Sequence, residues 1–310
     1  MSRSEISPDQ LIDREIGPVT ILFGHENGKY PDGNAVLVSG AHETIIIDPC
    51  LGVVARKDRL PRVDRVFHSH AHEDHLSGSH LFPDVPWYVH GEDLAGLQSL
   101  DGMMAMYGVE GPGVGEFKKM VTTQFNYLPR EDAHTFVDGD LYDLGGVTIE
   151  VLHTPGHTGG HCSFLIDWGA TEGRFVFLSD IELTGFGPYY GDACSSLVSF
   201  EKSIERLKHI DARWWLTFHH KGLFEPREHF LLKLEQYGGV IKSRERRLLE
   251  FLAEPRSMDE IVAHRFVYRP GVVDGNMVDN TERRSMARHL ERLLQSGTVI
   301  AMDDSRYRIV

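Results

Sequence analysis

The stretch Phe67-His68-Ser69-His70-Ala71-His72-Glu73-Asp74-His75-Leu76-Ser77-Gly78 concentrates histidines and carboxylates in one short segment. It follows an apolar run at residues 63–67, which is typical of a strand. In extended backbone His70 and His72 point to the same side, because side chains alternate with period two. Asp74 and His75 add two further donors. Four potential ligands within six positions predict a site for two metal cations side by side.

Short apolar runs recur through the first 220 residues between Gly, Pro and Asp, and they predict strands at 19–23, 35–38, 44–47, 63–67, 87–89, 147–152, 162–166, 175–178 and 214–218. Three of these runs end on a further potential metal ligand. The run at 147–152 leads into a turn with His157 at its tip, the run at 175–178 into Asp180, and the run at 214–218 into His219 and His220. Strands that end on ligands predict a site at one edge of a sheet scaffold.

Together these segments resemble the metallo-β-lactamase-fold superfamily of metal-dependent hydrolases over residues 15–222. The motifs that carry the resemblance are His70-x-His72-x-Asp74-His75, Thr154-Pro155-Gly156-His157-Thr158, Asp180 and His219. The resemblance implies an α+β fold, a four-layer αβ/βα sandwich with two sheets face to face, helices outside and the site along one edge.

The resemblance also implies which residues hold two divalent metal ions. His70, His72 and His157 would hold one metal, Asp74, His75 and His219 the other, and Asp180 would bridge the two. Imidazole and carboxylate ligands without thiolate suit zinc, iron or manganese, and we expect zinc. The segment Thr217-Phe218-His219-His220 departs from the family's usual proline-glycine-histidine, so His220 stays open as the last ligand.

The implied chemistry is hydrolysis. A hydroxide that bridges the metals would attack a carbonyl or phosphoryl centre, and Asp74 would orient the hydroxide and shuttle a proton. Tyr189 or Tyr190 could donate a hydrogen bond to the oxyanion or to the leaving group. Both lie in residues 185–196, which, like the Gly- and Met-rich residues 102–115, read either as an insert that shapes the substrate pocket or as a surface loop. The segment 102–115 looks like a mobile apolar insert.

Charge narrows the substrate class. Of 310 residues, 32 are Lys or Arg and 46 are Asp or Glu, so the formal net charge is −14. This charge disfavours nucleic acid and phosphodiester substrates. We therefore expect a small ester, lactone or thioester as substrate. The alternatives are a mononuclear iron sulfur (persulfide) dioxygenase and, further off, a DNA-binding regulator that combines a metal domain with a winged helix.

The C-terminal part changes to helical patterns, and we predict three parts: a catalytic domain at 1–222, a helical linker at 223–242 and a winged-helix-like domain at 243–310. Ser199 is the predicted N-cap of a helix at 200–210, and Gly238 and Gly239 predict a helix break. Ser257 and Glu260 predict a capping box, followed by a helix at about 282–294 and two strands at 298–302 and 306–310. From Arg244 onward 12 basic and 11 acidic residues leave a charge of only +1, which suits packing or dimerisation better than DNA binding.

Cysteine usage and the N-terminus indicate the compartment. Cys50, Cys162 and Cys194 are odd in number and far apart, as expected for free thiols in a reducing environment. No secretion signal is visible, and no apolar run approaches the roughly 20 residues that span a bilayer. We expect a cytoplasmic protein that acts on a small molecule, without nucleic acid or membrane partners, and a homodimer stays open.

Overall fold

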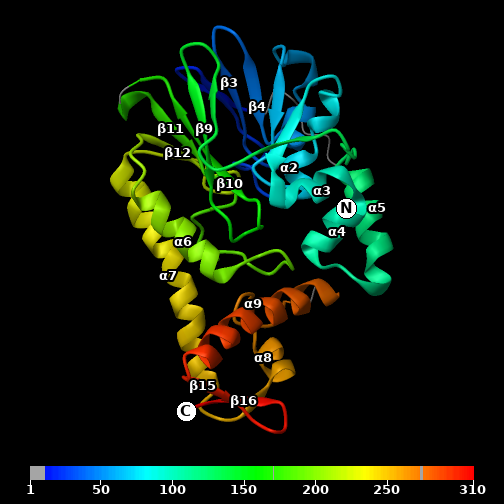
Figure 1. The fold of residues 1–310 in the computed structure, drawn as a ribbon, viewed down its shortest axis with the longest axis vertical. Helices are drawn as coiled ribbons and strands as arrows, with labels where there is room; N and C mark the ends of the chain where they lie inside the picture. Colours follow the sequence, from blue (N-terminus) through cyan, green and yellow to red (C-terminus); the bar gives the residue numbers. More distant parts are fainter. Residues whose placement is uncertain (1–10, 170, 273–274) are drawn as a thin grey trace.

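The computed structural model describes residues 11–169, 171–272 and 275–310. Over these residues two β-sheets pack face to face with helices on their outer sides, and a small third sheet lies near the C-terminus (Figure 1). This is the predicted α+β sandwich. The predictions about residues 1–10, namely the missing secretion signal and the start of the first domain, lie outside the described residues.

The strands fall into three sheets with a simple order. The first sheet has the order β1-β2-β3-β4-β5-β6-β7, the second β13-β12-β11-β10-β9-β8 and the third β14-β16-β15. The first comprises β1 (Asp13–Ile16), β2 (Val19–Leu22), β3 (Ala35–Ser39), β4 (Thr44–Ile47), β5 (Arg65–Phe67), β6 (Trp87–His90) and β7 (His134–Phe136). The second comprises β8 (Leu141–Asp143), β9 (Thr148–His153), β10 (Cys162–Asp167), β11 (Arg174–Phe177), β12 (Trp214–Leu216) and β13 (Leu223–Phe224). The third comprises β14 (Arg256–Ser257), β15 (Val299–Ala301) and β16 (Arg306–Ile309).

The helices connect and cover these sheets. They are α1 (Leu51–Val54), α2 (Glu73–Leu76), α3 (Leu94–Gln98), α4 (Leu100–Tyr107), α5 (Val114–Gln124), α6 (Leu197–Lys208), α7 (Arg227–Phe251), α8 (Met258–His264) and α9 (Gly275–Gln295). Short 3-10 turns are η2 (Lys57–Arg59), η3 (Ser79–Leu81), η4 (Gly91–Asp93), η5 (Gly111–Gly113) and η6 (Thr171–Gly173). Within the described residues no helix is both long and apolar enough to cross a membrane.

All nine strands predicted in the first 220 residues are present, because each apolar run supplies a buried face. In β10, Phe164 and Ile166 belong to the core between the two sheets, whereas Leu165 faces the helices outside. This alternation follows from the period of two in extended backbone. The strands β4 to β7 pair in parallel, as do β11 and β12, so the loops at their carboxyl ends gather at one edge.

Helices α6 and α7 cover the outer face of the second sheet (Figure 1). The predicted N-cap of α6 is wrong by three residues: Ser196, not Ser199, caps the helix and accepts a hydrogen bond from the Ser199 backbone N–H. The predicted break at Gly238 and Gly239 is also wrong. α7 continues across both glycines, and Gly238 lies beside Ile204 of α6, where an added Cβ would be in ordinary van der Waals contact at 3.4 Å. Burial against α6 and the sheet outweighs the weak helix propensity of glycine.

Residues 102–115, predicted as a mobile insert, are mostly helical, because they contain the end of α4, the turn η5 and the start of α5. Helix α4 occupies residues 100–107, and its Met103, Met104 and Met106 are buried in the core. Their side chains form the apolar face of the helix, which was hard to recognise in the sequence because glycines interrupt the pattern. Gly108 ends the helix in a left-handed conformation, as is typical of a glycine at this position.

The C-terminal part has its own apolar core. Leu248, Leu252, Ile261 and Leu290 belong to this core, which is separate from those of the sandwich. The predicted capping box at Ser257 is confirmed, and the two predicted strands are β15 and β16. Helix α9 begins at Gly275, earlier than predicted. The boundary predicted between residues 242 and 243 falls inside α7, and the winged-helix interpretation stays a prediction.

Candidate metal centre

A carboxylate from a neighbouring strand end fixes the loop after β5. Asp48 directly follows β4, which pairs in parallel with β5. It accepts hydrogen bonds from the Ser69 backbone N–H at 2.7 Å and from the Ser69 hydroxyl at 2.5 Å. The loop then runs through His70 and His72 into α2, and His72 is the last extended residue before this helix.

The seven predicted ligands gather into two adjoining buried groups, which we call the histidine–aspartate cluster. In each group the potential ligand atoms lie within 4.8 Å of one another; one group is His70, His72, His157 and Asp180, and the other is Asp74, His75 and His219. Asp180 lies between the groups, because its Oδ2 is 3.2 Å from His157 Nε2 and its Oδ1 is 3.1 Å from His75 Nε2. The carboxylate can therefore reach an ion in either group.

Buried atoms without hydrogen-bond partners show that the cluster fits metal ions. These atoms include Nε2 of His70, Nε2 of His75 and Oδ1 of Asp180. The last two approach each other, but not in hydrogen-bonding geometry. Buried polar atoms in proteins are nearly always paired, and those that are not call for an explanation such as an ion. Imidazole nitrogen and carboxylate oxygen are the ligands that zinc, iron and manganese accept, so the cluster is able to hold metal ions.

Neighbouring groups hold the opposite nitrogen of four of these rings. The contacts are His70 Nδ1 to Ser69 Oγ at 3.0 Å, His75 Nδ1 to Asp48 Oδ2 at 2.8 Å, His157 Nδ1 to the Tyr189 carbonyl at 3.2 Å and His219 Nδ1 to the Gly28 carbonyl at 2.6 Å. Contacts of this kind fix the orientation and tautomer of a ligand histidine. These four rings present Nε2 to the cluster.

His72 is oriented the other way round. Its Nδ1 lies 3.1 Å from His157 Nε2, inside the cluster, and its Nε2 lies 3.2 Å from Oδ2 of Asp192. Asp192 is buried, and it is absent from the predicted site. It lies in the loop between β11 and α6, within residues 185–196 that the sequence marks as a possible pocket-shaping insert, but no strand or motif singles it out there.

Opposite charges stabilise one another inside the cluster. Burial alone would lower the pKa of His75, but three carboxylates raise it well above its ordinary value: Asp180, Asp74 and Asp48. Burial alone would raise the pKa of Asp180, but His75 and His219 bring it well below its ordinary value. Histidines must lose their protons to bind metal, so metal ions would replace these protons and pair with the same carboxylates.

Glu182 is a further carboxylate that the sequence reasoning missed. It forms a third group with Asp180 and His219, again with potential ligand atoms within 4.8 Å of one another. Burial raises the pKa of its carboxyl to about 7. A signal existed, because Asp180-Ile181-Glu182 follows a predicted strand and places a second carboxylate two residues after the first.

The remaining predicted site residues differ in their relation to the cluster. His219 contacts Asp74, with Nε2 2.9 Å from Oδ2, whereas its neighbour His220 belongs to none of the groups. The Tyr189 ring lies beside His157, but its hydroxyl bonds Oδ1 of Asp192 at 3.1 Å. The Tyr190 hydroxyl bonds His289 of α9 at 2.9 Å and is thereby directed to that helix.

Glu73, inside the central motif, binds two tyrosines. It accepts a hydrogen bond from the Tyr30 hydroxyl at 3.1 Å and another from Tyr107. The Tyr107 ring stacks on His72, with ring centroids 4.5 Å apart. Tyr107 belongs to residues 102–115 and Asp192 to residues 185–196, so both segments predicted to shape the pocket contact His72.

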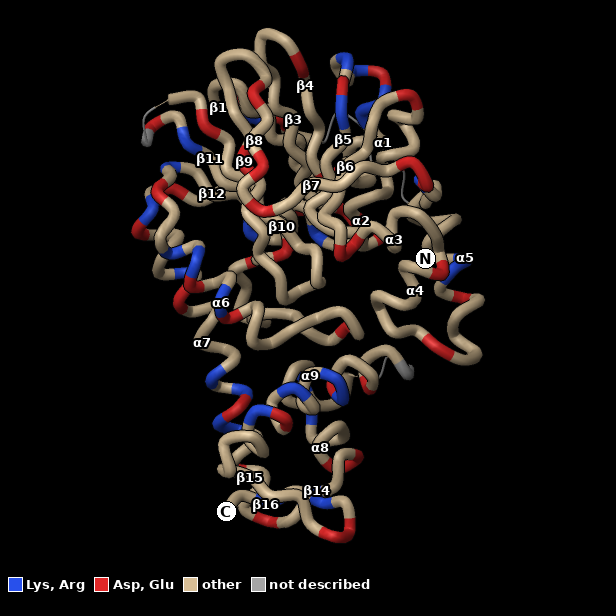
Figure 2. The backbone as a smooth tube through the Cα atoms, in the orientation of Figure 1, with Lys and Arg blue, Asp and Glu red and all other residues tan. Residues whose placement is uncertain are grey.

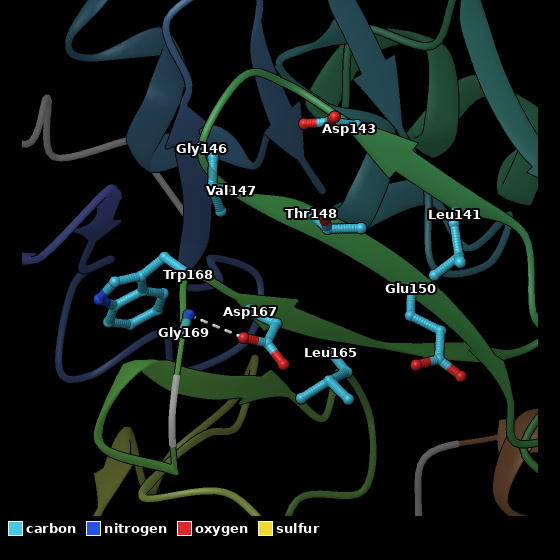
Figure 3. Close-up of a pocket in the computed structure, with 10 residues that line it drawn as sticks. All are labelled: Leu141, Asp143, Gly146, Val147, Thr148, Glu150, Leu165, Asp167, Trp168 and Gly169. Atoms are coloured by element: carbon cyan, nitrogen blue, oxygen red, sulfur yellow. Dashed lines mark hydrogen bonds between the residues drawn. The ribbon is translucent and has the colours of Figure 1, made fainter.

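A surface groove lies apart from this cluster (Figure 3). Its volume is about 530 Å³, and residues of β8, β9 and β10 line it, among them Asp143, Glu150 and Asp167. None of the ten lining residues belongs to the histidine–aspartate cluster. The groove is therefore separate from the candidate metal site, which is the histidine–aspartate cluster.

The chain belongs to the metallo-beta-lactamase superfamily, because the model of this family matches residues 30–213. Two solved structures share the fold over nearly the whole chain. A metallo-beta-lactamase family protein of Thermus thermophilus is 20% identical with a TM-score of 0.68, covering 97% of this chain and 98% of that chain. A beta-lactamase domain protein of Burkholderia ambifaria is 18% identical with a TM-score of 0.68, covering 100% of this chain and 99% of that chain.

Relatives among curated proteins match a smaller part. An uncharacterized protein of Mycobacterium leprae (strain TN) is 32% identical over 151 residues, which are 46% of this chain and 61% of that protein. An atrochrysone carboxyl ACP thioesterase of Aspergillus chevalieri is 24% identical over 163 residues, which are 52% of this chain and 44% of that protein. The match thus spans less than two thirds of the length of either relative.

Proposed function

We propose that the chain is a metal-dependent hydrolase that cleaves a small ester, lactone or thioester. The observation that carries the proposal is the position of Asp180 between two groups of buried histidines, in each of which one inward nitrogen, Nε2 of His70 or of His75, lacks a hydrogen-bond partner. His70, His72 and His157 would hold one ion, Asp74, His75 and His219 the other, and Asp180 both. Two zinc ions held in this way would supply a hydroxide nucleophile at neutral pH and polarise the bond under attack.

The chain's own groups would position the nucleophile and move its proton. Asp74 is our candidate for both roles. Its Oδ2 is held by His219 Nε2, which leaves Oδ1 to orient the nucleophile and to accept a proton. Tyr190 has no part in this proposal, because its hydroxyl bonds His289. The Tyr189 hydroxyl is engaged by Asp192, so we assign it to positioning instead of to substrate contact.

Charge and ancestry support the substrate class. A net charge of −14 argues against nucleic acid and other polyanions as substrates. The name of the Aspergillus chevalieri relative, a thioesterase, favours a thioester within the proposed class. No observation favours the iron dioxygenase or the DNA-binding regulator, so neither is carried forward.

Metal analysis and a substrate panel test the proposal together. Protein purified without added metal would be analysed for zinc, iron and manganese, and then assayed on chromogenic esters, lactones, thioesters and phosphodiesters. We expect two metal ions per chain and hydrolysis of a member of the first three classes. One iron per chain with oxygen uptake, or full hydrolysis by metal-free protein, would overturn the proposal.

Substitution of His157 links activity to the cluster. His157→Ala removes one ligand, so we expect metal content to fall and hydrolysis to drop by more than the ~10–100-fold that loss of an outer partner costs. The matched control is His209→Ala, an exposed histidine on the turn after α6. It should retain both metal and activity. Equal activity in the two variants would contradict the ligand assignment.

A further inference from the structure

Two neighbours hold His72, and both come from outside the loop that carries it. Asp192 Oδ2 lies 3.2 Å from Nε2 of His72, and the Tyr107 ring stacks on the imidazole at 4.5 Å between centroids. Among the other histidines of the cluster, His75 has a comparable pair, Asp48 on its Nδ1 and the Phe218 ring stacked at 3.7 Å between centroids, but these two lie after the ends of β4 and β12. The second nitrogens of the other histidines are held by Ser69, Asp48 and the carbonyls of Tyr189 and Gly28.

Helix α9 holds both of these neighbours in place. Arg284 donates to the Tyr107 carbonyl at 2.9 Å, and Arg288 donates to the Asp192 carbonyl at 2.6 Å. The two arginines are four residues apart and therefore lie on one face of α9. Figure 2 marks basic residues along α9, and Figure 1 shows the loop before α6 lying against this helix.

Two hydrogen bonds and a final ion-pair contact, whose two atoms are close but not in hydrogen-bonding geometry, lead from α9 to the imidazole. Thr281 Oγ1 lies 3.2 Å from the Tyr189 hydroxyl, which donates to Oδ1 of Asp192 at 3.1 Å, and Oδ2 of Asp192 faces His72. Thr281 and Asp192 are buried, with 3% and 2% of their surface exposed. The approach is close: a Cβ at Gly191 would lie 2.4 Å from Cγ2 of Thr281. Only glycine fits between the loop and α9 at this point.

Further contacts fasten the same loop to the C-terminal helices. Arg244 of α7 donates to the carbonyls of Pro188 at 2.6 Å and Phe186 at 2.7 Å. The Tyr190 hydroxyl bonds His289 of α9. Helices α7 and α9, which follow the strands of the sandwich in the chain, therefore both hold the loop that carries Asp192.

We propose that Asp192, Tyr189 and Thr281 are positioning residues that hold His72 in its metal-binding orientation, so that α9 is part of the metal centre. The inference rests on the metal-dependent function proposed above. Asp192 fixes the Nε2 side of the ring and thereby presents Nδ1 to the metal, and Thr281 holds Asp192 through the Tyr189 hydroxyl. Outer partners of ligand histidines typically tune metal affinity in this way.

The arrangement predicts an asymmetric effect. His72 belongs to the group with His70 and His157, whereas His75 and His219 are held by Asp48 and Gly28, which lie in the first sheet's loops. Loss of the contact from α9 should therefore weaken the binding of one metal ion and leave the binding of the other unchanged.

Metal titration of the apoprotein tests this. Zn²⁺ would be titrated against a competing chelator, and Co²⁺ binding would be followed by its visible absorption, for wild type, Asp192→Asn, Tyr189→Phe and Thr281→Val. We expect Asp192→Asn to weaken one of two binding steps by ~10–100-fold, with the other step unchanged. Tyr189→Phe and Thr281→Val should weaken the same step less, and the apoprotein melting temperature should stay near that of wild type.

Two controls separate positioning from general damage. Thr281→Ser keeps the hydroxyl and should restore the affinity lost in Thr281→Val. Arg283→Ala removes an exposed α9 side chain that pairs with Asp259, and it should bind both ions as wild type does. Wild-type binding by all variants, or equal weakening of both steps, would overturn the inference alone. Wild-type protein that binds no metal would overturn the proposed function and this inference with it.

Discussion

Single buried carboxylates tie the loops of the metal centre to one another. Asp93 is fully buried and accepts hydrogen bonds from the Thr158 hydroxyl at 2.6 Å and the Gly160 backbone N–H at 2.7 Å. The Ala71 backbone N–H lies 3.3 Å from the same carboxylate. Asp93 thus joins the loop that carries His72 to the loop that carries His157.

Asp93→Ala should destabilise the protein, because it leaves buried donors without partners. Each such donor costs about 1–3 kcal/mol, so loss of the partner of all three should lower the free energy of unfolding by at least about 3 kcal/mol. Urea unfolding of the metal-free protein measures it. Asp84→Ala, at an exposed position, serves as the control and should change little. Unaltered stability of Asp93→Ala would show that the two loops are held by other contacts.

The residues in and around the metal centre show how much of the candidate site the sequence could predict. The seven predicted ligands lie in short motifs or directly after apolar runs, and the structure brings them together. Asp93 and Asp192 contact these loops from segments that are not adjacent to them in the sequence. Nothing local distinguishes them from surface aspartates, so only the tertiary structure identifies them.

At the scale of elements, helix α7 gives a direct test of helix propensity. Gly239 is exposed inside the helix, and a Cβ there would meet nothing within 4 Å. Gly239→Ala should therefore raise the free energy of unfolding by about 0.5–1 kcal/mol, because alanine loses less backbone entropy in a helix. Gly156→Ala should do the opposite, since its φ is +139° and a Cβ would lie 2.4 Å from Cα of Phe200. Urea midpoints of the two variants that move in the same direction would contradict this account.

Strands were easier to predict than helices for a physical reason. An apolar run such as Thr44-Ile45-Ile46-Ile47 carries its burial in consecutive residues, and it matches β4 residue for residue. In α4 and α7, glycines interrupt the pattern, and only contacts with other elements outweigh their propensity. The methionines of α4 reach the core, and α6 packs on α7, neither of which a local pattern reveals.

At the scale of the whole molecule, the C-terminal helices are joined to the sandwich through a buried polar contact. His289 of α9 bonds the Tyr190 hydroxyl through Nε2 and lies 3.0 Å from Glu245 of α7 through Nδ1. Arg292 also pairs with Glu245 and with Glu201 of α6. One network therefore connects α6, α7, α9 and the loop before α6. We expect protonation of His289 to change the stability of the whole molecule.

The pH dependence of stability tests this connection. Burial lowers the pKa of His289, although Glu245 opposes the shift, while Arg292 and Arg244 reinforce it. Just below the ordinary histidine pKa of about 6.5, the unfolded chain then binds a proton that the folded chain does not. The contribution of His289 is complete above that pH and is lost as the pH falls. We expect the fall in melting temperature between pH 7 and 5.5 to be smaller in His289→Gln than in wild type. Above pH 5 Glu245, whose pKa is lowered, stays ionised and does not contribute to the difference. Parallel curves for the two proteins would show that the network does not couple α9 to the sandwich through this proton.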